Sequence, residues 1–512
     1  MSAASGAHAP PSARRVVRHR LIVAAFVLGA ATVFGFAPFY LFFVTVLTLA
    51  ALLAMLDGEH AWSAARLGFA WGLGFFLFGV SWVYVSLHDF GAMPAPLAAL
   101  ATLLFCAFLA LFPALAAYVH ARLALDPGAK FMLIFPATWT LLEWTRGWLF
   151  TGFPWLGAGY SQIPLSPLAG YAPVIGIYGV TLATAASAGI LAHLWRSYRQ
   201  KQRVSLMFAA AALAIWLAGW GLKAVEWTEP AGEPVTVSLL QGNVPQDLKF
   251  REDRLQKTLE DYRALALSSA SRLIVFPETA LPLFLEHVPQ AYLSELAAHA
   301  RRNGGDLLIG VPERLRDGRY YNTVVSMGSS PAQRYRKVHL VPFGEFIPLR
   351  PLLGGIVGAL AIPLQDFTRG PEYPQPLEVA GQRIAVNVCY EDAFGEEIIR
   401  QLPQATLLVN VSNVAWFGRS IAPQQHLQIS QARALETGRY MLRATNTGVT
   451  AVIDTRGQVV NAAPEFTQVA LTAHVPGYAG ATPYVRWGNL AALALCAFLL
   501  VCGWTCGRRK RD

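Results

Sequence analysis

Eight long apolar runs, nearly free of charged residues, constrain the fold of this 512-residue chain more than any other feature. The hydrocarbon core of a bilayer is about 30 Å thick, and a helix crosses it with about 20 apolar residues. Each run approaches that length, so each is predicted to be a membrane-spanning helix. The runs are Leu21–Phe36, Leu41–Leu56, Leu67–Leu87, Pro94–Ala121, Phe131–Leu149, Val174–Trp195, Ser205–Leu222 and Val485–Cys506.

The acidic residues are concentrated in one part of the chain. Only 14% of all residues are charged, against roughly 25% in an average soluble domain. Of the 31 acidic residues, five precede Val225, one follows Tyr484, and 25 lie between. The predicted order is a basic N-terminus at 1–20, seven spans in 21–224, a soluble α/β domain in 225–484, a last span in 485–506 and a basic tail at 507–512.

Arginine and lysine gather on alternate connections between the apolar runs, and the positive-inside rule assigns those connections to the cytoplasm. Seven runs precede Val225, so the soluble domain is expected on the opposite side of the membrane. In a bacterium with two membranes this predicts an inner-membrane protein with a periplasmic domain. The basic residues flank apolar runs and are not interleaved with aromatics on a polar face, so the charge of +10 indicates topology and no nucleic-acid partner.

Between Val225 and Tyr484 the pattern changes to short β-branched runs separated by helical segments with mixed faces, which favours a layered α/β domain. The predicted strands are Val235–Leu240, Leu273–Phe276, Leu307–Val311, Thr323–Met327, Ile384–Val388, Thr406–Val411 and Val449–Ile453. The predicted helices are Arg251–Ser269, Gln290–Asn303 and Pro423–Leu442.

Three strand ends in this domain carry reactive groups, namely Glu278, Lys337 and Cys389. The thiol has no cysteine partner in its domain, so it is either an inert buried residue or a nucleophile. Together the three groups supply a thiol, a carboxylate able to take its proton and a cation able to stabilise an oxyanion, which thioester chemistry requires. Asn322 and Asn413 also lie near strand ends, where they could donate hydrogen bonds or simply form turns.

These residues resemble the Glu-Lys-Cys triad of the nitrilase superfamily, which implies an αββα sandwich. The resemblance extends to the membrane-embedded apolipoprotein N-acyltransferases of Gram-negative bacteria. It rests on Pro-Glu-Thr-Ala at 277–280, Pro-Phe-Gly-Glu at 342–345, Cys-Tyr-Glu at 389–391, Ala-Trp-Phe-Gly at 415–418 and the membrane segment 143–155. The expected fold is therefore a multi-span helical bundle joined to a nitrilase-like sandwich.

The resemblance implies that Cys389 is the nucleophile, Glu278 the general base and Lys337 the group that stabilises the tetrahedral intermediate. Further residues match family positions or motifs and are expected to support the site. They are Glu345, Tyr390, Glu391, Trp416 and Phe250, the last standing where the family often has Trp.

Two of these supporting residues also suggest roles from their chemistry. Glu345 could orient Lys337, or it could cap a loop. Glu391 could position an incoming amine, or it could be a surface carboxylate.

The resemblance implies a ping-pong transfer of an acyl chain from a phospholipid, through a thioester, to the N-terminal amine of a diacylated apolipoprotein. It implies no metal or organic cofactor, and His339 and His426 lack the spacing of metal ligands. We expect a monomer. The alternatives are a membrane-anchored amidase, because the triad alone does not choose between water and an amine, and a transporter, which the scarcity of ionisable groups in the spans disfavours.

Pro351–Gln365 is a stretch of uncharged residues directly after the Pro342–Pro348 segment. It is too short to span a bilayer. The expectation is either a buried core helix or a mobile interfacial arm that gates acyl chains.

Overall fold

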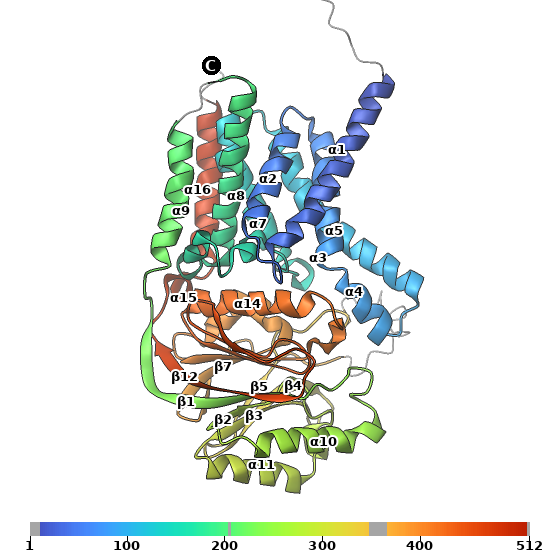
Figure 1. Cartoon of the computed structure of the whole chain (residues 1–512), viewed down its shortest axis with the longest axis vertical. Coiled ribbons are helices and arrows are strands. Elements are labelled where there is room, and N and C mark those ends of the chain that lie inside the picture. The colour runs from blue at the N-terminus through green and yellow to red at the C-terminus, as the bar shows by residue number, and fades with distance from the viewer. Residues whose placement is uncertain (1–10, 203–205, 348–365, 509–512) are drawn as a thin grey trace, which may run out of the picture.

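A bundle of helices stands on a layered α/β domain in this computed structural model, which describes residues 11–202, 206–347 and 366–508 (Figure 1). The expected arm at Pro351–Gln365 lies outside the described residues. The principal helices of the bundle are α1 (Pro11–Thr32), α2 (Phe43–Leu56), α3 (Ala61–Gly79), α4 (Trp82–Val85), α5 (Ala95–Arg122), α7 (Phe135–Arg146), α8 (Ala172–Arg199), α9 (Leu206–Leu222) and α16 (Leu490–Arg508).

Not all eight predicted spans have the length to cross a bilayer. By length and composition, four described segments can cross, namely Arg18–Gly35, Ala95–Arg122, Pro167–Arg199 and Leu490–Arg508, or five if the bent pair that begins with α3 is one span. The helices α2 and α9 are shorter, with 14 and 17 residues. The α7 run is divided because a π-turn at Lys130–Ile134 precedes its 12 helical residues.

Two bundle helices are broken near the α/β domain. α3 ends at Gly79, and the segment Trp82–Phe90 continues at an angle of 49°. α8 is interrupted at Ile175 and Gly176, where the glycine adopts a φ of +68°. A break in a helix frees backbone groups, which need partners other than lipid.

The α/β domain contains two six-stranded sheets packed face to face. The first has the order β12-β1-β2-β3-β4-β5, with β12 (Val469–Ala479), β1 (Glu229–Gln241), β2 (Leu273–Val275), β3 (Asp306–Arg314), β4 (Tyr320–Gly328) and β5 (Arg334–Arg336). The second has the order β11-β10-β9-β8-β7-β6, with β11 (Val459–Ala462), β10 (Ala451–Ile453), β9 (Met441–Thr445), β8 (Leu407–Ser412), β7 (Gln382–Val388) and β6 (Leu377–Val379).

Helices cover both outer faces of this sandwich. α10 (Glu252–Leu267) and α11 (Gln290–Arg302) lie on the first sheet, far from the bundle, whereas α14 (Ala422–Thr437) lies between the second sheet and the bundle (Figure 1). The αββα arrangement confirms the expected nitrilase-like sandwich. The strands β1, β2 and β3 are mutually parallel, as are β7, β8 and β9, so their carboxyl ends meet at common edges.

One predicted helix was too long. α14 ends at Thr437 and not at Leu442, because Gly438 takes a left-handed conformation with φ +62° that terminates it. The chain then turns directly into the strand Met441–Thr445, which the sequence pattern missed.

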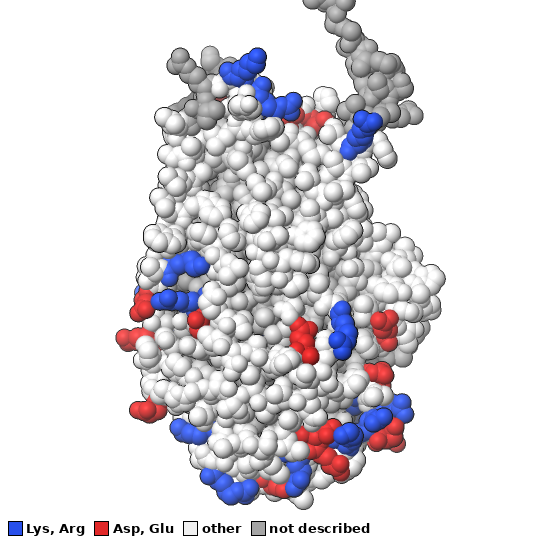
Figure 2. Space-filling model, viewed as in Figure 1, with Lys and Arg blue, Asp and Glu red and all other residues white. Residues whose placement is uncertain are grey.

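Charge on the bundle is confined to its ends. Figure 2 shows a broad uncharged band across the bundle, with Lys and Arg at the end remote from the α/β domain. Arg196 at that end pairs with Asp57 at 3.0 Å.

Candidate active site

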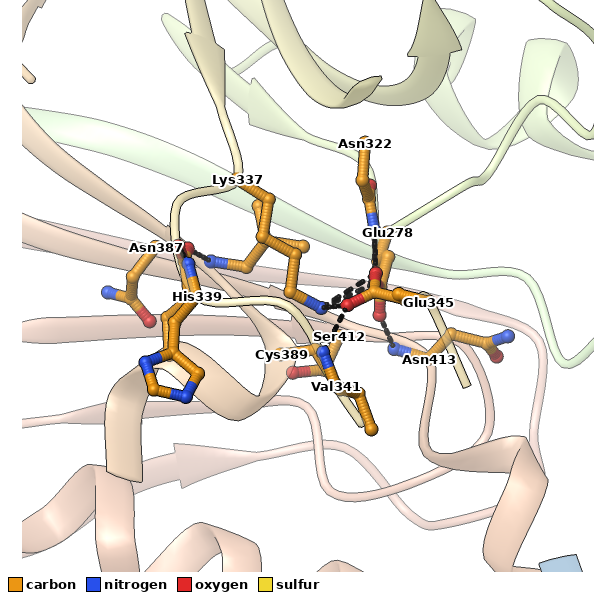
Figure 3. Close-up of polar contacts among 12 residues, drawn as sticks. Glu278, Asn322, Lys337, His339, Val341, Glu345, Asn387, Cys389, Ser412 and Asn413 are labelled. Atoms are coloured by element: carbon orange, nitrogen blue, oxygen red, sulfur yellow. Dashed lines mark hydrogen bonds and ion pairs between the residues drawn. The ribbon is translucent and has the colours of Figure 1, made fainter. Parts of the chain in front are cut away.

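The carboxyl ends of three strands bring the predicted triad together. Glu278 lies three residues beyond β2, Lys337 directly follows β5, and Cys389 directly follows β7. Figure 3 shows the Lys337 ammonium pointing at the carboxylates of Glu278 and Glu345, with Cys389 beside them. Residues that are distant in sequence therefore form one buried cluster.

Lys337 lies between two carboxylates. Its Nζ is 2.9 Å from Glu345 Oε2 and 3.6 Å from Glu278 Oε1, and the side chain is 1% exposed. Burial alone would lower the pKa of Lys337, but the charges of Glu345 and Glu278 outweigh burial and raise it. Lys337 is thus a cation at neutral pH, which is able to stabilise an oxyanion. The contact with Glu345 is the one expected of a residue that orients Lys337.

The Cys389 thiol is held in a strained and largely buried position. Its backbone has a φ of +54°, which non-glycine residues seldom adopt. Burial raises the pKa of the thiol, the charge of Glu278 raises it further, and Lys337 opposes both. The resting thiol is therefore protonated, and attack requires a base that takes its proton in the same step.

Glu278 is fixed by the two asparagines noted at strand ends. Asn322 Nδ2 donates to Glu278 Oε1 at 2.7 Å, and the Asn413 backbone N–H donates to Oε2 at 2.8 Å. Asn322 also donates to Glu345 at 2.9 Å, so one amide joins both carboxylates. The side chain of Asn413 points elsewhere and donates to Gln246 at 2.8 Å.

Glu391 has contacts that favour neither the surface role nor the amine-positioning role. Its carboxylate accepts hydrogen bonds from the backbone N–H groups of Val338, His339 and Val388, and from the hydroxyl of Tyr335. Burial raises its pKa to about 7, with Lys337 and these backbone donors opposing the shift. Both oxygens are occupied, so Glu391 ties the loop that carries Lys337 to the loop that carries Cys389.

Known proteins resemble this chain along its whole length. Residues 28–190 match the family described as Apolipoprotein N-acyltransferase N-terminal domain, and residues 236–484 match Carbon-nitrogen hydrolase. The apolipoprotein N-acyltransferase of Nitrosomonas europaea is 57% identical over 96% of this chain and 98% of its own. That of Chromobacterium violaceum is 47% identical over 100% of this chain and 99% of its own.

The chain belongs to the apolipoprotein N-acyltransferase family. Among solved structures, an amidase from Nesterenkonia sp. is 19% identical, with a TM-score of 0.38, and covers 51% of this chain and 95% of the amidase.

Of three further expected residues, Tyr390 and Trp416 contact the membrane segment, whereas Phe250 precedes α10 on the remote side of the sandwich. The Tyr390 hydroxyl donates to the Gly152 carbonyl at 2.9 Å, so the residue after Cys389 touches the membrane segment. Phe250 is 37% exposed. Trp416 meets Phe90 edge to face at 6.3 Å, which places it at the boundary with the bundle and outside the polar cluster of the triad.

Sequence reasoning missed Lys249, a second buried lysine at this site of the N-acyltransferase. The side chain is 2% exposed and its Nζ donates to the backbone carbonyl of Glu278 at 3.2 Å. Burial lowers its pKa to about 8, and the charges of Glu278 and Cys389 oppose this. The available signal was its place in the loop between β1 and α10, because β1 pairs in parallel with β2 and shares its carboxyl edge.

The described residues contain no group of three or more His, Cys, Asp or Glu side chains arranged to hold a metal ion. The two histidines considered for this role each face one carboxylate. His339 Nδ1 lies 2.9 Å from Glu397, and His426 Nε2 lies 2.7 Å from Asp392.

Proposed function

We propose that this chain transfers an acyl chain from a membrane phospholipid to the N-terminal amine of the diacylglyceryl-cysteine of a lipoprotein. The observation that carries the proposal is the contact between Tyr390 and Gly152. Tyr390, which follows the proposed nucleophile, donates a hydrogen bond to the membrane segment, so the loop that carries the thiol contacts the bundle. A lipid ester can reach such a thiol without leaving the membrane.

In the first half-reaction the sulfur of Cys389 attacks the ester carbonyl of the phospholipid, and Glu278 takes the thiol proton. The oxyanion that forms is stabilised by the ammonium of Lys337. The bond between the carbonyl carbon and the glycerol oxygen then breaks, and Glu278 returns the proton to that oxygen. The products are a lysophospholipid and a thioester on Cys389.

In the second half-reaction the neutral α-amine of the lipoprotein attacks the thioester carbonyl. Glu278 takes a proton from the nitrogen and gives it to the departing sulfur of Cys389. An amide forms and the thiol is regenerated. The lipoprotein is then triacylated.

Hydrolysis of a soluble amide is the less supported alternative. The same triad can deliver an acyl group to water, but an amidase needs no extensive bundle beside its nucleophile. The identity of 57% to an apolipoprotein N-acyltransferase extends over 96% of this chain and so includes the bundle.

We further propose the inner membrane as the location, with the domain at 225–484 in the periplasm, the basic termini in the cytoplasm and the chain acting as a monomer. The positive-inside rule supports this orientation, because Arg199 and Arg508 lie in the last turns of α8 and α16, which end on the side remote from the α/β domain (Figure 1).

Mass spectrometry of lipoprotein N-termini in cells depleted of this protein tests the proposed function. Diacylated forms are expected to accumulate. Unchanged triacylated termini after depletion would contradict the proposal.

A further inference from the structure

Three glutamines on one face of α14 form a row of hydrogen bonds to the bundle. Gln425, Gln428 and Gln431 are spaced three residues apart, and none is more than 3% exposed. We call these three residues the glutamine row. Side chains of this kind are seldom buried unless they are bonded.

Gln425 and Gln428 bond backbone groups at irregular points of the membrane segment, whereas Gln431 accepts from the Tyr40 hydroxyl at 3.1 Å and donates to the Gly457 carbonyl of the α/β domain at 2.8 Å. Gln425 Nε2 donates to the carbonyl of Gly79, the last residue of α3, at 3.0 Å. Gln428 accepts from the Ala37 N–H at 2.9 Å and donates to the Ile163 carbonyl at 2.8 Å. These backbone groups cannot be satisfied by lipid, so the row provides partners that they need.

Gln425 differs from the other two because it bonds two indoles. Its Oε1 accepts from Trp82 Nε1 at 3.1 Å and from Trp155 Nε1 at 2.8 Å. The Trp155 ring also lies 5.3 Å from the ring of His426 and stacks on Tyr390 at 6.4 Å with an interplanar angle of 17°. One membrane-segment side chain thus touches three residues around the nucleophile.

His426 connects this cluster to Cys389. Its Nε2 lies 2.7 Å from Asp392 Oδ1 and 3.2 Å from the Cys389 carbonyl oxygen, while Nδ1 is buried without a partner among the described residues. Two acceptors at Nε2 and none at Nδ1 assign the proton to Nε2. The Cys389 carbonyl also accepts from Asn410 Nδ2 at 3.1 Å.

These bonds act on a strained backbone. Residues other than glycine seldom adopt the left-handed region, and Cys389 is there with φ +54°. Asn410 and His426, which donate to the Cys389 carbonyl, hold the residue in that conformation. Trp155 packs against the His426 ring and fixes its position.

We propose that Trp155 and Gln425 are positioning residues that hold the Cys389 loop from the membrane side, acting through His426 and Tyr390. The bundle then does more than deliver lipid, because it completes the geometry of the nucleophile. This inference rests on the proposed role of Cys389 as the nucleophile.

The test compares Gln425→Met, which keeps the length of the side chain and loses its hydrogen bonds, with wild type in the full-length protein. Vesicles of phosphatidylethanolamine and phosphatidylglycerol serve as the acyl donor, and single-turnover acylation of Cys389 is followed by intact mass. We expect the maximal rate to fall by about tenfold or more, with the lipid concentration at half-saturation changed by less than twofold. A raised half-saturation with an unchanged maximal rate would overturn the proposal.

Alkylation of Cys389 by iodoacetamide, quantified by peptide mass spectrometry, gives a readout that needs no lipid. The rate is expected to fall in Gln425→Met, because a displaced thiol loses its proton acceptor. A rate equal to or above that of wild type would overturn the proposal. If wild type forms no acyl-enzyme but alkylation still slows in the variant, the proposed function fails and this inference stands.

The matched control is Gln424→Met. Gln424 is the preceding residue on α14 and bonds Glu465 within the α/β domain. Both rates should equal those of wild type in this variant, and a fall matching that of Gln425→Met would overturn the proposal. Trp155→Phe keeps the ring and loses the indole N–H, so it provides the same test if Gln425→Met does not fold.

Discussion

The side-chain nitrogen of Lys249 lies 3.2 Å from the backbone carbonyl oxygen of Glu278, the proposed general base. A lysine buried to 2% exposure loses its hydration, and one carbonyl does not replace it. Burial of Lys249 therefore lowers the free energy of unfolding. The cation lies near Glu278 and Cys389, the proposed base and nucleophile.

Replacing Lys249 with Met is expected to stabilise the fold and slow the reaction. The pKa of Lys249 is lowered from 10.5 to about 8, so the unfolded chain binds the proton more tightly than the folded chain. The free energy of unfolding therefore rises as pH increases from 8 to 10.5 and is reduced below pH 8. Removing the lysine should recover stability on the order of 3 kcal/mol at pH 7.

The melting temperature of Lys249→Met should exceed that of wild type at pH 7, and the difference should shrink toward pH 10. Acylation of Cys389 should slow roughly tenfold, the effect of one charge-assisted hydrogen bond. Lys249→Arg, which keeps a cation, is the control for the rate. A less stable Lys249→Met protein would contradict the assignment of a strained buried lysine.

The covalent intermediate can be weighed directly. Wild type given phospholipid and no acceptor should gain one acyl chain that hydroxylamine removes, and Cys389→Ala should gain none. Glu278→Gln and Lys337→Ala should acylate at least on the order of 10² times more slowly. Cys502→Ala, which changes a thiol in α16, should behave as wild type. Turnover by a wild-type enzyme that never carries an acyl group would exclude the ping-pong route.

Glu391→Gln should loosen the two loops that Glu391 joins. A carboxylate accepts all four of its donors, whereas an amide has one acceptor oxygen and leaves two donors unpaired. The acylation rate of wild type should rise through pH 7, because the pKa of Glu391 is about 7 and the ionised form holds the loops. Burial raises this pKa from 4.5, so the free energy of unfolding falls as the pH rises from 4.5 to 7.

The pH-rate profile measures this effect. Glu391→Gln should be slower by on the order of 10² and should lack the step near pH 7. Glu378→Gln, at an exposed position of β6, is the control and should keep the wild-type profile. A step that persists in Glu391→Gln would assign it to another group.

Reporter fusions test the proposed orientation. An alkaline phosphatase fused after Gly305 should be active, because that position lies in the domain proposed to be periplasmic. The same reporter fused at Asp512 should be inactive. The opposite pattern would refute both the orientation and the proposed substrates.

The short β-branched runs were enough to predict a layered α/β domain, and the resemblance to the nitrilase superfamily predicted the sandwich and the approach of Glu278 to Lys337. Strand patterns alone did not place Lys337, because it follows β5, which pairs antiparallel with β4. The sequence did not reveal Lys249 as a buried residue, because lysines in loops are usually exposed to solvent. It left Glu391 as either a supporting residue or a surface carboxylate, and only the fold shows that the side chain is buried with backbone N–H groups converging on it.

The glutamine row was hidden for a related reason. The polar residues of α14 suggest one face in water, yet residues from Ala422 to Thr437 are buried almost throughout. What covers them is the membrane segment, which comes from a part of the chain more than 200 residues earlier. The sequence of α14 alone therefore could not predict that the membrane segment covers this face.

The α8 break has a consequence for protein engineering. The Ile177 N–H freed at the break donates to Glu436 Oε1 at 2.6 Å, and Glu436 pairs with Arg433 at 3.0 Å, both on the bundle side of α14. Cutting the chain at the domain boundary would expose this ion pair and its apolar surroundings on one fragment and an open helix start on the other. A water-soluble version of this enzyme therefore requires a redesigned α14 surface, and deletion of the bundle alone will not produce one.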